Sequence, residues 1–70
     1  LDFSNISQIE QKIEEELGEV KREIKRGKDP SYEIGDLIFS VVNLSRFLDI
    51  DPAHALFISM EKFRKRFEKV

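Results

Sequence analysis

The sequence contains no cysteine, so neither a disulfide nor a thiolate metal site can hold its 70 residues together. It has no apolar run of about 18 residues, as a membrane-spanning helix needs, and no signal-peptide pattern. It has no basic excess either, because 12 lysines and arginines face 14 acids for a net charge of −2. That balance argues against a nucleic-acid-binding module. We therefore expect a cytoplasmic protein that binds neither membranes nor nucleic acid.

The motifs of several enzyme classes are also missing. There is no glycine-rich phosphate loop, no Ser-His-Asp arrangement and no zinc-ligand spacing. A chain of 70 residues lies near the lower size limit at which a single core is stable. We therefore expect one domain over residues 1–70 that forms a homo-oligomer, either a dimer or a tetramer.

Apolar residues recur at helical spacing along the chain, without the alternation typical of strands. This pattern predicts an all-α fold with three helices, over residues of about 7–26, 30–48 and 52–69. Ser7 and Glu10 match a capping box at the first helix start. At the other two starts stand Asp29-Pro30 and Asp51-Pro52, with Asp as the cap and Pro at the first helical position. Because the connections are short, we expect neighbouring helices to run antiparallel.

The second predicted helix is apolar around most of its circumference. Its polar side chains fall within about 80° of one another on a helical wheel; they are Glu33, Asp36, Ser40 and Asn43. A helix that is apolar nearly all round is usually buried. Its two carboxylates would then lie close to the interior, where an unpaired charge is costly, so we expect a cation or a metal to compensate them.

The first predicted helix carries an acidic pair with the same spacing. Glu16 and Glu19 lie together on the flank beside the apolar stripe, whereas Glu14 and Glu15 point to the far side. Two such pairs on consecutive antiparallel helices can converge on one point. Four converging carboxylates suit magnesium, or manganese. The alternative for each acid is a solvated helix surface, which is the more common position of a single glutamate.

The third predicted helix supplies basic side chains. Lys62 and Arg66 share one flank of its apolar stripe and are candidates for binding phosphate oxygens. Cations near a helix C-terminus also simply oppose the helix dipole, and this reading is equally open. Asn43 on the second helix is a candidate for contacting substrate, with helix packing as its alternative role.

Three motifs follow one another in the chain: K-I-E-E-E-L-G-E at Lys12 to Glu19, E-I-G-D-L-I-F-S-V-V-N-L-S-R at Glu33 to Arg46, and E-K-F-R-K-R-F at Glu61 to Phe67. In this order they resemble the MazG-type nucleoside triphosphate pyrophosphohydrolases of the all-α pyrophosphatase group. The resemblance implies a four-helix bundle. It also implies hydrolysis of a nucleoside triphosphate between its α and β phosphates, which gives the monophosphate and pyrophosphate.

The same resemblance implies roles for individual residues. The magnesium ligands and catalytic carboxylates would be Glu16, Glu19, Glu33 and Asp36. Lys12 and the segment from Lys62 to Arg66 would face the nucleotide. Family members have a further helix before the point where this sequence begins, so we expect residues 1–70 to lack that first helix and to complete the bundle by oligomerisation. The alternative function is a non-catalytic helical interaction module with residual metal binding.

Overall fold

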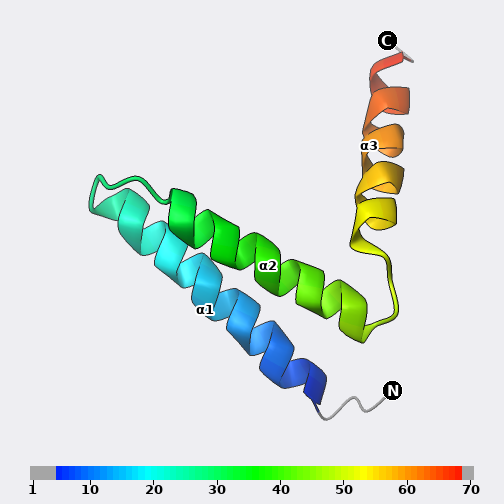
Figure 1. The fold of residues 1–70 in the computed structure, drawn as a ribbon. Helices are drawn as coiled ribbons and strands as arrows, with labels where there is room; N and C mark the ends of the chain where they lie inside the picture. The colour runs from blue at the N-terminus through cyan, green and yellow to red at the C-terminus, as the bar shows by residue number, and fades with distance from the viewer. Residues whose placement is uncertain (1–4, 69–70) are drawn as a thin grey trace.

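The computed structural model describes residues 5–68 as three helices joined by two short connections (Figure 1). The helices are α1 (Ile6–Lys25), α2 (Ser31–Phe47) and α3 (Pro52–Glu68). The described range contains no strand, so the predicted all-α class is confirmed and the helix bounds agree closely with those expected. The end predicted for the third helix, residue 69, lies outside the described residues. Within the described range no helix is long and apolar enough to cross a membrane.

Aspartate side chains begin α2 and α3, as the two Asp-Pro pairs predict. The Asp29 carboxylate accepts hydrogen bonds from the Ser31 amide at 3.0 Å and the Ser31 hydroxyl at 2.6 Å. The Asp51 carboxylate accepts one from the Ala53 amide at 3.0 Å. These bonds satisfy amides that have no partner within the helix. The two hydrogen bonds from Ser31 also lower the pKa of Asp29. Pro30, expected as the first helical residue, instead lies just before α2.

The capping box predicted at Ser7 and Glu10 is wrong. α1 begins one residue earlier, at Ile6, after an Asn5 whose backbone is already helical, with φ −91° and ψ −10°. Ser7 is therefore inside the first turn and not at the cap position, from which a side-chain oxygen can reach an unpaired amide. The other end of α1, at Lys25, lies one residue before the predicted end at residue 26. Gly27, with φ 71°, ends the helix, and the amides of Gly27 and Lys28 donate back to carbonyls of the last turn.

α1 and α2 lie side by side as a hairpin, whereas α3 leads away from it (Figure 1). α3 contacts α2 around their connection, and the described residues of α3 make no contact with α1. The radius of gyration is 15.1 Å, compared with about 11 Å for a compact domain of this length. A single copy therefore does not form a closed bundle. Antiparallel packing of all three helices stays a prediction.

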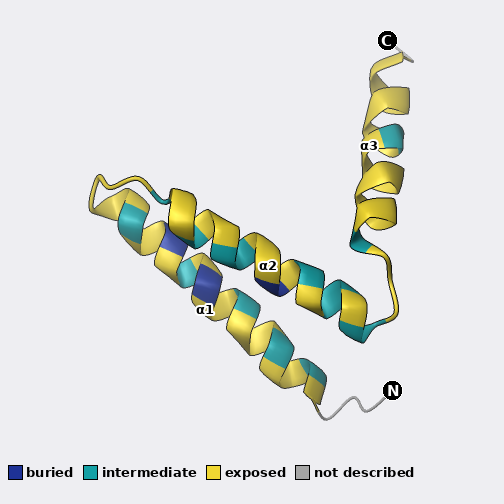
Figure 2. Cartoon of the chain, in the orientation of Figure 1, coloured by how far each residue is buried: buried dark blue, intermediate teal, exposed yellow. Residues whose placement is uncertain are grey.

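Little apolar surface is buried within one copy (Figure 2). Val20 is the one hydrophobic residue that is buried among residues 5–68. Large apolar side chains stay exposed on α2 and α3; they include Ile38, Phe39, Leu56, Phe57, Met60, Phe63 and Phe67. The expectation that the second helix is buried is wrong for a single copy, because α1 covers only one face of it. Phe39, on an uncovered face, is 65% exposed.

Substitution by alanine should have opposite effects on stability at two glycines, Gly18 within α1 and Gly27 just after it. At Gly27 the left-handed backbone makes a Cβ cost about 1–2 kcal/mol, so Gly27→Ala should lower the melting temperature. At Gly18 a Cβ would meet nothing within 4 Å, so Gly18→Ala should stabilise α1 by about 0.5–1 kcal/mol. Thermal unfolding at matched protein concentration measures both. A Gly27→Ala variant as stable as the parent would contradict this description of the helix end.

Candidate functional site

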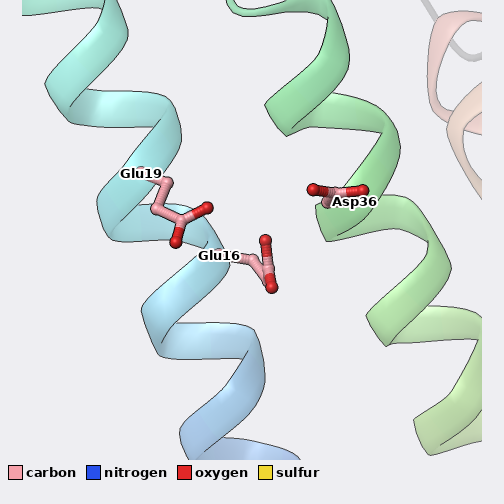
Figure 3. A group of neighbouring side chains, drawn as sticks. All are labelled: Glu16, Glu19 and Asp36. Carbon is pink, nitrogen blue, oxygen red and sulfur yellow. The ribbon is translucent and has the colours of Figure 1, made fainter.

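Three carboxylates gather where α1 faces α2. They belong to Glu16 and Glu19 on α1 and to Asp36 on α2, and one oxygen from each lies within 4.8 Å of the others. In Figure 3, Glu16 points across the space between the helices toward Asp36, and the Glu19 carboxylate lies beside it. The i, i+3 spacing puts the two glutamates on one flank of α1, and the hairpin brings Asp36 opposite them. We call these three residues the carboxylate group.

Glu16 is the most constrained member of the carboxylate group, because its side chain is buried and only half satisfied. The residue is 5% exposed. The ammonium of Lys12, one turn earlier, lies 2.9 Å from its Oε1. Its Oε2 is buried and has no hydrogen-bond partner among the described residues. A buried carboxylate oxygen without a partner costs free energy, and a neighbouring carboxylate, when ionised, cannot donate to it. A cation at this position would satisfy it.

The donor set of the carboxylate group fits a hard divalent cation. Magnesium takes carboxylate oxygens and keeps several waters, and manganese accepts similar ligands. Glu16 is buried, Asp36 half-buried and Glu19 exposed, so the group is partly buried and partly open to solvent. Oxygen-only ligation is less suited to zinc, which prefers histidine and cysteine.

Glu33, the fourth ligand predicted from the sequence, lies outside the carboxylate group. It is half-buried on α2, about one turn before Asp36. A single copy thus brings three of the four predicted carboxylates together. The part of Glu33 in metal binding stays a prediction.

The predicted substrate-binding cations divide between two places. Lys12 lies at the edge of the carboxylate group with its side chain 61% exposed, and its hydrogen bond to Glu16 and the charge of Glu16 raise its pKa. Lys62 and Arg66 are exposed on α3, whose described residues do not contact α1. One copy therefore does not bring these two cations to the carboxylates.

A small pocket adjoins Lys12 farther along the hairpin. It has a volume of about 170 Å³ and is lined by Gln8, Ile9, Lys12, Ser40 and Asn43. Ser40 is only 7% exposed, whereas the side chain of Asn43 is accessible. Asn43 was predicted to contact substrate, but Gln8 was not recognised. The sequence feature that could have indicated Gln8 is its position, one helical turn before Lys12 and two turns before Glu16.

Known proteins match nearly the whole chain. Residues 4–70 match the family described as the MazG nucleotide pyrophosphohydrolase domain. The chain is 47% identical over 72 residues to the nucleoside triphosphate pyrophosphohydrolase/pyrophosphatase MazG of Thermotoga maritima. It is 34% identical over 73 residues to the nucleoside triphosphate pyrophosphohydrolase of Escherichia coli strain K12. Both alignments cover 99% of this chain but only 27% and 28% of those relatives, so the chain spans about a quarter of their length. No solved structure matches it significantly.

Neutralising one member of the carboxylate group should stabilise the protein when metal is absent. In a chelating buffer Asp36→Asn should raise the free energy of unfolding by on the order of 1 kcal/mol, because it removes repulsion from Glu16 and Glu19. Magnesium should then raise the melting temperature of the parent more than that of the variant. Glu14→Gln, exposed on α1 and outside the group, is the matched control. Equal effects of the two substitutions on metal-free stability would contradict a converging group.

Proposed function

The chain belongs to the MazG nucleotide pyrophosphohydrolase domain family, and from that premise we propose that it carries a magnesium-dependent nucleoside triphosphate pyrophosphohydrolase site. The observation that supports this most is the buried Glu16 carboxylate, with one oxygen unpaired beside two further acids. The relatives in Thermotoga maritima and Escherichia coli are named as nucleoside triphosphate pyrophosphohydrolases. That supports a nucleoside triphosphate as substrate, and a cytoplasmic location would accompany it.

In the proposed site Glu16, Glu19 and Asp36 hold the divalent cation, with Glu33 as the further ligand. Magnesium is the proposed ion, and manganese its substitute. When bound, such an ion neutralises phosphate charge and lowers the pKa of a coordinated water. The burial of Glu16 supports this assignment, since a bound cation would give its unpaired oxygen a partner.

The protein's own side chains hold and orient the substrate in this proposal. Lys12 stays protonated at neutral pH and, exposed at the edge of the carboxylate group, donates to phosphate oxygens. Asn43 contacts the substrate from α2. Water adds to one phosphorus of the α–β bridge while the bridging P–O bond breaks, so that the monophosphate and pyrophosphate separate. The water gives up a proton, for which the carboxylates of the site are nearby acceptors.

The proposed activity predicts different results for two glutamates on α1. With mixed nucleoside triphosphates and magnesium, the protein should release pyrophosphate, and Glu16→Gln should lower the rate by more than about 100-fold. Glu14→Gln is the matched control, because Glu14 is exposed and lies outside the carboxylate group, and it should leave the rate unchanged. No pyrophosphate release would refute the proposed activity, and no rise in melting temperature on adding magnesium would in addition refute the proposed metal site.

We also propose that the chain forms a homo-oligomer, a dimer or a tetramer, through the uncovered faces of α2 and α3. An apolar groove of about 630 Å³ lies between these helices; it is lined by Leu37, Ile38, Val41, Val42, Ser45, Pro52, Ala55 and Leu56. A contiguous exposed apolar surface of this kind is typical of an interaction surface. In such an assembly α3 of another copy would supply Lys62 and Arg66 to the nucleotide.

Sedimentation velocity tests this assembly. The protein should sediment as an oligomer, and Ile38→Asp should shift it toward smaller species, because a charge in a covered apolar groove is costly. Ile24→Asp is the matched control, since Ile24 on α1 is 61% exposed and Ile38 is 59% exposed. A monomer at every concentration, or equal dissociation of both variants, would refute an interface on this groove.

The second candidate function is a non-catalytic helical interaction module that retains metal binding. The wide exposed apolar surface of α2 and α3 favours it. Under this alternative the chain assembles, and magnesium raises its melting temperature, but no pyrophosphate appears. The assays above therefore separate the two functions.

A further inference from the structure

Polar side chains continue beyond the carboxylate group in two matched rows. On α1 the row runs from Glu16 through Lys12 to Gln8, and Gln8 lies about 12 Å along the helix from Glu16. On α2 it runs from Asp36 through Ser40 to Asn43, with Asn43 about 10 Å along the helix from Asp36. The two rows therefore extend by similar distances along the hairpin, and their far ends line the same pocket of about 170 Å³.

The chemistry changes along these rows. Carboxylates occupy one end, the Lys12 ammonium follows, and two carboxamides, Gln8 and Asn43, occupy the pocket end. A carboxamide both donates and accepts hydrogen bonds, which matches the mixed donors and acceptors of a sugar or a base. A phosphate, which presents charged acceptors, is better matched by Lys12 and by a bound cation. Ile9 adds an apolar wall to the pocket.

We propose that this pocket receives the nucleoside end of the substrate and that Gln8 is a specificity-determining residue within it. The inference rests on the proposed function, since that function puts the phosphates at the carboxylate group. Gln8 is exposed on the first turn of α1, so its carboxamide is accessible to a ligand. Asn43 faces the same pocket from α2, and the two amides hydrogen-bond to polar groups of one nucleoside.

Nuclear magnetic resonance tests the pocket without requiring turnover. In the presence of magnesium, AMP, GMP, CMP and UMP are added separately, and the side-chain amide signals of Gln8 and Asn43 are followed. At least one nucleotide should shift both signals. Tripolyphosphate, which has no nucleoside, should shift the signals around Lys12 and leave Gln8 unmoved. Binding of nucleotides without a change at Gln8, or no binding of any of them, would overturn the inference.

Substitution of Gln8 tests its part in specificity. Gln8→Leu should change the ratio of kcat/KM between nucleoside triphosphates by about three- to tenfold, the effect of one neutral hydrogen bond, while inhibition by tripolyphosphate stays the same. Gln11→Leu is the matched control, since Gln11 is on the same helix but does not line the pocket. Unchanged ratios in Gln8→Leu would overturn the inference while leaving the proposed function intact. Nucleotide-induced shifts at Gln8 without pyrophosphate release would instead overturn the proposed function alone.

Discussion

The buried carboxylate of Glu16 is the constraint around which the hairpin is arranged. One of its oxygens is paired with Lys12 and the other has no partner among the described residues, while the carboxylates of Glu19 and Asp36 lie close by. Such an arrangement is costly as long as all three groups are ionised and no cation is present. A bound divalent cation would turn this cost into a favourable interaction, so metal binding and the stability of the hairpin are expected to be coupled.

The proposed chemistry and the proposed assembly use different surfaces of the chain. The facing sides of α1 and α2 carry the carboxylate group, Lys12 and the pocket beyond it. The remaining surface of α2 and the surface of α3 expose many large apolar side chains, and α3 has no buried residue among those described. A radius of gyration of 15.1 Å shows how open one copy is. The chemistry is therefore proposed to lie within the hairpin, and the missing core to come from assembly.

Sequence periodicity predicted the three helices and the meeting of Glu16, Glu19 and Asp36, because both depend on local spacing and a short connection. It did not predict that one copy leaves Lys62 and Arg66 on a helix apart from α1, since a helical wheel shows which face is apolar but not what covers it. The expected burial of α2 failed for the same reason. The capping box at Ser7 failed because a helix can start without a side-chain cap, one residue before the best cap motif. Gln8 was missed because its position one turn before Lys12 gains meaning only once the fold shows that both residues line one pocket.

The central claim is that the unpaired oxygen of Glu16 is a metal ligand shared with Glu19 and Asp36. Anomalous diffraction from crystals grown with manganese tests it most directly. The account predicts a manganese peak in contact with the carboxylates of these three residues, with Glu16 Oε2 among the ligands. A well-ordered hairpin at saturating manganese with no peak at the carboxylate group, or with manganese only at acids elsewhere on the surface, would contradict it.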